Sequence, residues 1–309
     1  MICTFSAMLL TAPLIGAPAP KAQATVDALV DLLPDDTAAI MVLDMPRLAK
    51  SPFGKRMLEV LSAQPTNLPW LDFNKLGKDV DLAVVGQFAI EAFAGDFCFL
   101  LRLREGSEIP KKLAEIAGDK PIGVGKAAVY SIHQEGSLYF AALDRNTIAV
   151  VMLCGEVKKE SVVKEGLEAV FGAKRKGPRA ELRKLLKGID QESTIAIVSE
   201  HPKSANSALF AFSPFVQTNN LNEYKGKVVR FNLEIKMSDK AEVRAQVEMD
   251  AAATAEAVAK AVEDSKAKPG ESPWQKEMAE AMKITRDKEK LQMRGSIAAK
   301  QLDLALPKN

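Results

Sequence analysis

The sequence predicts an α+β protein built from two related halves with antiparallel sheets. Short apolar or alternating segments recur along the chain between turn residues, which is the pattern of β-strands, and amphipathic segments of helical length separate them. In each half the predicted order is strand-helix-strand-strand-helix-strand. That order is typical of a ferredoxin-like unit, so we expect antiparallel sheets with helices on one face.

A repeated motif supports the division into halves. Residues 36–47 (DTAAIMVLDMPR) align without gaps with residues 192–203 (ESTIAIVSEHPK). Each copy begins with an acidic residue, continues as an apolar strand, and ends with an acid, one further residue, a proline and a base. Pro46 and Pro202 are predicted to turn the strand into a helix. We interpret the match as a tandem duplication; because the match is short, coincidence is the competing interpretation.

The first half begins with the first motif copy. Ser51 can cap a helix over 51–62 whose first residue is Pro52. Further helices are predicted near 108–117 and 156–171. The remaining segments are strands near 80–88, 96–104, 127–133, 137–143 and 147–153. Several of these strands are apolar at nearly every position, which indicates that both of their faces are covered.

The second half contains a hairpin whose register can be predicted. Apolar and polar residues alternate over 228–237 and 241–249, so one face packs and the other meets water. A three-residue loop, 238–240, places Glu234 opposite Arg244, and the polar pairs on that face are then complementary. The other predicted elements are helices near 203–212, 251–266 and 273–283 and a strand near 289–297.

The N-terminus has the layout of a secretory signal. An uncharged apolar run over 2–16 precedes two A-x-A patterns, the second of which ends at Ala24. We therefore expect export to the periplasm or beyond, with a buried N-terminal helix as the alternative. The predicted organisation is a signal peptide (1–24), a first half (25–172), a basic linker with a short helix (173–190) and a second half (191–309).

Composition excludes several classes of function. The chain has 42 basic and 40 acidic residues, a formal charge of +2, so no overall field indicates a nucleic-acid binder. The two histidines and three cysteines have no metal-ligand spacing, and we predict no metal or cofactor. After signal removal the remaining cysteines are Cys98 and Cys154, interpreted as small buried hydrophobes rather than a disulfide. No second segment is long and apolar enough to span a membrane.

One short segment is strongly basic. Its side chains could bind an anionic partner, although a solvated linker is the favoured interpretation because charge runs usually remain in water. No aromatic residue interleaves them, which argues against nucleic acid. The candidate patch consists of Lys174, Arg175, Lys176, Arg179, Arg183, Lys184 and Lys187.

The search for catalytic motifs finds only weak matches. Ser161 and Lys164 fit the S-x-x-K pattern of penicillin-binding enzymes, but the companion K-T-G motif is absent. The glycines around Lys126 lack the spacing of a phosphate loop and are interpreted as a β-turn. His133 and His201 have no partner at metal-binding spacing, and we expect neither of them to act with Ser161. No catalytic residue is assigned.

The segment 32–56 resembles a group of uncharacterised exported proteins typical of planctomycete-type bacteria. In that group a signal peptide precedes an LPxDT strand motif ending in VLD and a short SPxGK helix. The resemblance implies export and an unknown function, and it carries over no catalytic residue. The matching residues are Leu33, Pro34, Asp36, Thr37, Asp44, Ser51, Pro52, Gly54 and Lys55.

The leading functional hypothesis is a non-catalytic binding or structural protein. A protein partner or small molecule would dock between the two halves. Two alternatives stay open: an envelope hydrolase whose acidic residues meet only in the fold, and a carrier of lipid or another hydrophobe. A pocket with converging carboxylates would favour the hydrolase, an apolar tunnel the carrier, and an open sheet face the binding protein.

Overall fold

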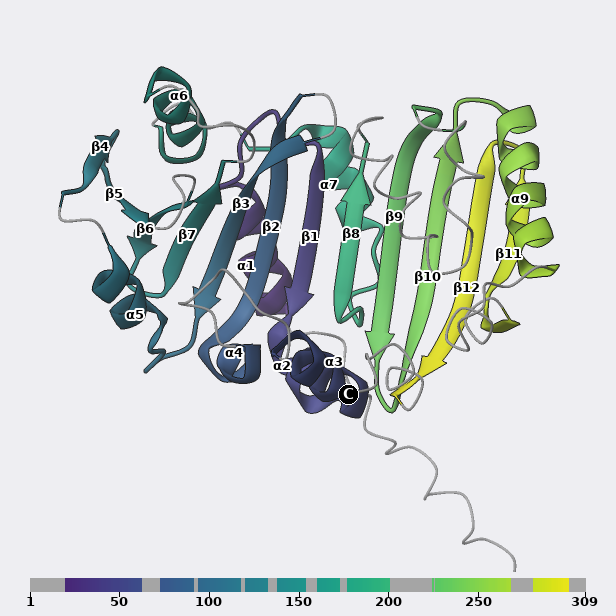
Figure 1. Cartoon of the computed structure of the whole chain (residues 1–309), viewed down its shortest axis with the longest axis horizontal. Helices are drawn as coiled ribbons and strands as arrows, with labels where there is room; N and C mark the ends of the chain where they lie inside the picture. Colours follow the sequence, from purple (N-terminus) through teal and green to yellow (C-terminus); the bar gives the residue numbers. More distant parts are fainter. Residues whose placement is uncertain are drawn as a thin grey trace, which may run out of the picture.

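The computed structural model contains one twelve-stranded sheet that runs through both halves of the chain (Figure 1). It describes residues 20–62, 73–91, 94–117, 120–132, 138–153, 160–172, 177–200, 224, 226–267 and 280–299. The strand order is β11-β12-β10-β9-β8-β1-β2-β3-β7-β6-β5-β4. Neighbouring strands are antiparallel throughout. The α+β class with antiparallel strands is therefore confirmed.

The first half supplies seven strands and most of the helices. Its strands are β1 (Ala39–Asp44), β2 (Val80–Glu91), β3 (Ala94–Leu103), β4 (Ile122–Val124), β5 (Ala127–Ile132), β6 (Leu138–Asp144) and β7 (Thr147–Met152). Its helices are α1 (Pro20–Val30), α2 (Met45–Lys50), α3 (Pro52–Ser62), α4 (Phe73–Asp79), α5 (Ile109–Ile116) and α6 (Glu160–Phe171). Ser51 caps α3 as predicted, because its Oγ accepts a hydrogen bond from the Gly54 N–H at 2.9 Å.

The second half contributes the remaining five strands. They are β8 (Ile195–Ser199), β9 (Val228–Met237), β10 (Lys240–Met249), β11 (Lys283–Asp287) and β12 (Lys290–Ala298), with α7 (Ala180–Lys187) before β8 and α9 (Ala252–Ala267) after β10. The strand β11 lies where the sequence predicted the end of a helix. Residues 203–212, and most of the predicted helix near 273–283, lie outside the described residues.

The predicted ferredoxin-like pairing is wrong. In a split βαβ unit another strand separates the two strands that a helix connects, whereas β1 and β2 are direct neighbours here. The helices α2, α3 and α4 connect these two strands and return the chain antiparallel beside β1. The order of elements along the chain was predicted correctly, but it does not determine which strands pair.

The expectation that helices lie on one face of the sheet is also wrong. Side chains alternate between the two faces of a strand, so Val84 and Ala83 point to opposite sides. Val84 belongs to a core with α1, α6 and α7, and Ala83 belongs to a core with α2, α3 and α5. We call these sides the α1/α7 face and the α5/α9 face. The first-half strands are covered on both faces, as their apolar sequences predicted.

The hairpin β9–β10 has the predicted register. Glu234 lies opposite Arg244, and Ala241 lies opposite Met237. The one difference is at the far end, where an irregularity places Met249 opposite Val228. In consequence Val228 is buried, whereas Val229, predicted to face the core, is 36% exposed. The helix α9 packs against the apolar side of this hairpin.

The two copies of the repeated motif form the centre of the sheet. The strands β1 and β8 pair antiparallel, and Met41 lies opposite Ile197, the residue with which it aligns in the repeat. The predicted turn at Pro46 is present, because β1 ends at Asp44 and α2 begins at the next residue. Pro202 lies outside the described residues.

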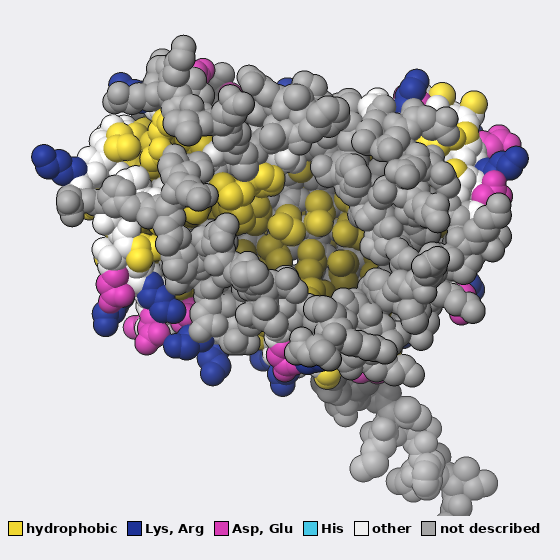
Figure 2. All heavy atoms as spheres, viewed as in Figure 1, with side chains coloured by type: hydrophobic (Ala, Val, Ile, Leu, Met, Phe, Trp, Pro, Cys, Tyr) yellow, Lys and Arg dark blue, Asp and Glu magenta, His cyan; other side chains and the backbone are white. Residues whose placement is uncertain are grey.

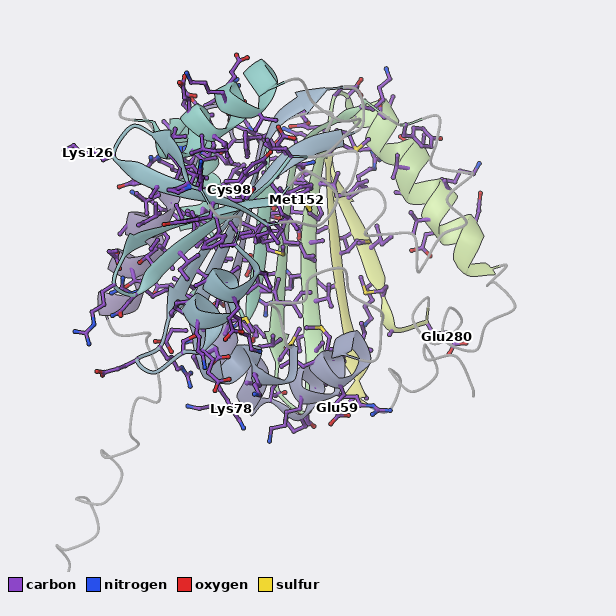
Figure 3. The ribbon with its side chains drawn as sticks, turned by 60° about the vertical axis from the view of Figure 1, so that its left-hand side comes forward. Glu59, Lys78, Cys98, Lys126, Met152 and Glu280 are labelled. Carbon is purple, nitrogen blue, oxygen red and sulfur yellow. The ribbon has the colours of Figure 1, made fainter. Side chains whose placement is uncertain are left out.

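Two expectations about exported proteins meet the structure only in part. Cys98 is buried in the first-half core, as predicted for a small hydrophobe, and Cys154 lies outside the described residues. Figure 3 shows Cys98 and Met152 within the first-half sheet. No helix in the described ranges has the length and apolar character needed to cross a bilayer.

Candidate functional site

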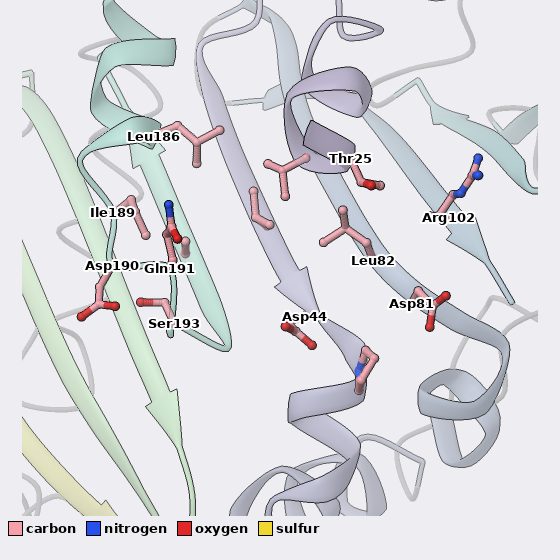
Figure 4. A pocket seen from close by; sticks show the side chains of 14 residues that line it. Thr25, Asp44, Asp81, Leu82, Arg102, Leu186, Ile189, Asp190, Gln191 and Ser193 are labelled. Atoms are coloured by element: carbon pink, nitrogen blue, oxygen red, sulfur yellow. The ribbon is translucent and has the colours of Figure 1, made fainter. Parts of the chain in front are cut away.

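A pocket of about 370 Å³ lies on the α1/α7 face where the two halves meet (Figure 4). It is formed by β1 and β2 of the first half, the turn before β8, and the helices α1 and α7. Its volume falls in the range of small-molecule sites. We call it the junction pocket. Its apolar lining consists of Val26, Val42, Leu82, Leu186, Ile189 and Ala196.

The sequence explains the apolar floor. Val42 and Ala196 are direct partners across β1 and β8, and both point to the α1/α7 face. The side chain of Ala196 is small, so the sheet leaves space beneath the helices at this point. Leu186 comes from the buried side of α7, and Val26 comes from α1. The floor therefore depends on two central strands that pair only in the folded chain.

Three carboxylates and several other polar side chains form the rest of the lining. Asp44 ends β1, Asp81 begins β2, and Asp190 lies in the turn before β8. Antiparallel neighbours alternate in direction, so the end of one strand meets the beginning of the next. Three acids that are far apart in sequence thus converge on one pocket. The other polar lining residues are Thr25, Arg102, Gln191 and Ser193.

Two of the three acids have evident structural partners. Asp44 caps α2 by accepting a hydrogen bond from the Arg47 N–H at 2.9 Å, and the Arg47 side chain forms an ion pair with it at 3.3 Å. The same guanidinium donates to the Gln191 carbonyl at 2.6 Å, which ties the end of β1 to the turn before β8. Asp81 pairs with Arg104 at 2.5 Å.

Asp190 is held most firmly. Its carboxylate pairs with Lys236 of β9 at 2.7 Å and accepts a hydrogen bond from the Glu192 N–H at 2.9 Å. The hydrogen bond from Lys236 is the main reason that the pKa of Asp190 is lowered, and the same contact raises the pKa of Lys236. Asp190 is therefore ionised at neutral pH and is suited to accepting hydrogen bonds.

Ser193 differs from its neighbours. Its Oγ is buried and is the one buried side-chain oxygen or nitrogen, among the described residues, that has no hydrogen-bond partner. A buried hydroxyl without a partner costs about 1–3 kcal/mol. Such groups are usually satisfied by water or a ligand. Because Ser193 lines the junction pocket, a bound molecule could supply the missing partner.

Arg102 is the basic group of the lining. Its guanidinium donates to the Thr147 hydroxyl at 2.8 Å and pairs with Asp144 at 3.4 Å. Both partners lie on strands further into the first half, so the charge of Arg102 is already compensated. The available hydrogen-bonding groups of the pocket are mainly acceptors.

The basic patch predicted from the sequence is only partly described. Lys174, Arg175 and Lys176 lie outside the described residues, and Arg179, Lys184 and Lys187 are exposed on or beside α7. Arg183 instead has structural contacts. It donates to the Pro178 carbonyl at 2.9 Å and pairs with Asp31, which follows α1, and these contacts join α7 to the N-terminal segment.

The rejected catalytic motifs do not form a site in the described part of the chain. Ser161 lies in α6, whereas His133 and His201 lie outside the described residues, so the expectation that they do not act together stays a prediction. The glycine segment forms the turn between β4 and β5, with Gly125 at φ 59°, as interpreted from the sequence. Figure 3 shows Lys126 pointing outward at this turn. No group of three or more potential metal ligands occurs among the described residues.

The α5/α9 face has a second feature, an apolar hollow over the middle of the sheet (Figure 2). Its floor includes half-buried side chains of the central strands, among them Ile197, Leu233 and Ile235. Because these residues keep part of their surface exposed, the hollow is not filled by the cores beside it.

The fold and site together define an α+β protein with one large antiparallel sheet and a pocket where its halves meet. No protein-family model matches the chain, and no curated protein matches it. Among solved structures the chain is similar to TP0453. Crystal form III has a TM-score of 0.51 and 9% identity, covering 90% of this chain and 98% of that one. Crystal form I has a TM-score of 0.50 and 9% identity, covering 89% and 95%. At this identity the likeness shows the fold alone.

Proposed function

We propose that this chain is an exported binding protein without catalytic activity, and that it holds a small amphiphilic molecule in the junction pocket. The observation that supports this proposal is the lining of the pocket. An aliphatic floor lies beside a set of hydrogen-bond acceptors that includes the unpartnered Ser193 hydroxyl. Pockets with a mostly apolar lining and a few placed polar groups are typical of small-molecule sites.

The state of the carboxylates favours binding over hydrolysis. A general acid or base must be able to exchange a proton with the substrate at the working pH. Asp190 has a lowered pKa and is paired with Lys236, and Asp44 serves as the cap of α2. Asp81 is paired with Arg104. These contacts orient the acids as fixed acceptors, so the hydrolase hypothesis receives little support from their convergence.

The lining also indicates the chemistry of the ligand. Its floor favours an aliphatic body, and its carboxylates, together with Gln191 and Ser193, favour a polar end that donates hydrogen bonds. A primary amine or a hydroxyl satisfies this requirement. A carboxylate does not, because it would bring a fourth negative charge beside Asp44, Asp81 and Asp190.

A matched ligand series tests this proposal. Octylamine, octanol and octanoate have the same aliphatic chain and differ in the polar end. We expect the amine and the alcohol to raise the melting temperature of the full chain and octanoate to leave it unchanged. Leu82→Asn, which places an amide in the apolar floor, should abolish the rise. Equal stabilisation by all three compounds, or undiminished stabilisation of the Leu82→Asn variant, would contradict the proposal.

The apolar hollow of the α5/α9 face favours a second candidate function, the carriage of a hydrophobe. Half-buried aliphatic side chains on central strands would accept an acyl chain without a specific polar end. The same ligand series separates the two functions. A carrier that uses this hollow should respond to Leu233→Asn on the α5/α9 face and be indifferent to Leu82→Asn on the opposite face.

We also propose that the two halves arose by tandem duplication and that the chain is exported with cleavage near Ala24. The pairing of Met41 with Ile197, its counterpart in the repeat, supports the duplication, because two copies related by a local twofold axis would meet in this way. A comparison of homologous sequences in which the two motif copies vary independently, with no shared pattern, would contradict the duplication.

A further inference from the structure

The part of the α1/α7 face that belongs to the second half is an open polar surface. On this face, polar side chains from β9, β10, β12 and β11 form rows that run across the sheet. One row is unusual because three of its members are basic. Arg244 of β10 lies opposite Arg294 of β12, and Arg294 lies opposite Lys283 of β11. All three side chains are exposed.

These cations are not compensated by their neighbours. Like charges directly opposite each other in a sheet are destabilising. The only acid in the row is Glu234, opposite Arg244, and its carboxylate instead accepts a hydrogen bond from the Asp190 N–H at 3.3 Å. Within the described part of the chain, Arg244, Arg294 and Lys283 form no ion pair. A row of uncompensated cations on adjacent strands is costly unless it serves a purpose.

The rest of the same face does balance its charges. Arg230 pairs with Glu248 at 3.5 Å, and Lys240 pairs with Glu242 at 2.9 Å. Lys236 bridges to Asp190 and the neighbouring turn. The excess of positive charge is therefore local to the row of Arg244, Arg294 and Lys283, and it is not a general property of the surface.

A second, independent observation is the composition of the adjacent row. Two positions along the strands, Gln246 lies opposite Gln292, and Gln292 lies opposite Thr285 of β11. These side chains share the face of the arginines because residues two apart point the same way. They supply uncharged amide and hydroxyl donors about 7 Å along the strands from the cations. Two guanidinium groups thus lie next to two carboxamides on one flat surface.

We propose that this surface is a binding site for a phosphate-type oxyanion. The forked guanidinium groups of Arg244 and Arg294 would each donate two hydrogen bonds to the anion, which arginine does better than lysine. Lys283 would add a further positive charge. The amides of Gln246 and Gln292 would donate to the remaining oxygens. The anion would also compensate the repulsion between the two arginines, so binding and local stability are linked.

Phosphate titration of the full chain tests this site. Inorganic phosphate is added at low ionic strength and binding is followed by the chemical shifts of backbone amides on β10 and β12, with chloride at matched ionic strength as the reference. Arg244→Gln and Arg294→Gln should each weaken phosphate binding by about tenfold or more, because a charge-assisted hydrogen bond is worth about 1.5–3 kcal/mol. Arg230→Gln is the matched control, since that arginine shares the face and is already paired. It should change binding by no more than about twofold.

The source of the oxyanion is distinguished by vesicles. Zwitterionic vesicles with and without phosphatidic acid are sedimented with the wild-type chain and with both arginine variants. Binding that requires phosphatidic acid and is lost in the variants assigns a lipid headgroup. Phosphate binding without vesicle binding assigns a soluble or polymer-borne phosphate. Either result supports the site.

Two results would overturn the inference. One is a wild-type chain that responds equally to phosphate and to chloride. The other is phosphate binding that survives both arginine substitutions. Loss of folding does not confuse the test, because removing one of two facing arginines should leave the urea midpoint of unfolding unchanged or slightly raised.

Discussion

Lys236 offers the sharpest test of how the junction pocket is held together. Its ammonium group pairs with Asp190 at 2.7 Å and with Glu192 at 2.9 Å, so one side chain of β9 anchors the turn that lines the pocket. The side chain is 27% exposed, so solvent screens part of the interaction. A Lys236→Met variant keeps the aliphatic stem and removes the charge. Two partly screened ion pairs sharing one lysine predict a loss of about 1–2 kcal/mol.

Urea unfolding at neutral pH measures this loss, and Lys240→Met is the matched control. Lys240 lies on the same face and forms a single pair with Glu242 at 2.9 Å, with both side chains nearly half exposed. Its replacement should cost less than about 0.5 kcal/mol. If Lys236→Met is no more destabilising than Lys240→Met, the anchoring role of Lys236 is refuted.

The pH dependence of the same variant has a definite sign. The folded-state pKa of Asp190 is lowered, chiefly by its hydrogen bond with Lys236. The contribution of this pair is therefore present above the unfolded value of about 4 and is lost as pH falls through the lowered folded-state pKa. The pKa of Lys236 is raised, so the contribution is complete below about 10.4 and is lost as pH rises through the raised value. The difference between wild type and Lys236→Met should shrink at both extremes.

Two further predictions concern the first half. Gly54→Ala should destabilise the protein by about 2 kcal/mol or more, because a Cβ at Gly54 would lie 2.0 Å from the Leu48 carbonyl oxygen, whereas Gly106→Ala meets no atom within 4 Å and should cost only about 1 kcal/mol through its φ of 82°; melting curves of the two variants decide. Expression in a bacterial host with the native leader should give a mature N-terminus between residues 20 and 26 by mass spectrometry, and an intact Met1 on cytoplasmic protein would contradict export.

The hairpin shows what the sequence could predict. The alternation over β9 and β10 limits the register to even sums of paired residue numbers, and the charges select the register that places Glu234 opposite Arg244. Both constraints are local, because they involve two strands joined by a short loop. The irregularity that buries Val228 in place of Val229 was not predicted, since it lies at the far end of the hairpin and depends on contacts with other elements.

The junction pocket shows what could not be predicted. It exists because β1 pairs with β8, which brings Val42 opposite Ala196 and leaves space under α1 and α7. Nothing in either segment indicates that the two motif copies pair with each other rather than lie in separate sheets. The acids illustrate the same difficulty. Asp81 was interpreted as a strand-end residue, which is correct, but its proximity to Asp44 follows only from the pairing of β1 with β2.

Glu234 links the two sites that the structure suggests. In the isolated hairpin its partner would be Arg244, and the polar face of β9 and β10 would neutralise itself. In the folded chain the turn before β8 lies close enough for the Asp190 N–H to donate a hydrogen bond to Glu234, while Lys236 reaches the Asp190 carboxylate. The contacts that stabilise the turn of the junction pocket are thus drawn from the hairpin. The hairpin gives up the acid that would have balanced Arg244, and Arg294 on the next strand adds a second positive charge instead of compensating the first. The position of one turn therefore accounts both for the fixed acceptors of the pocket and for the uncompensated cations on the open face.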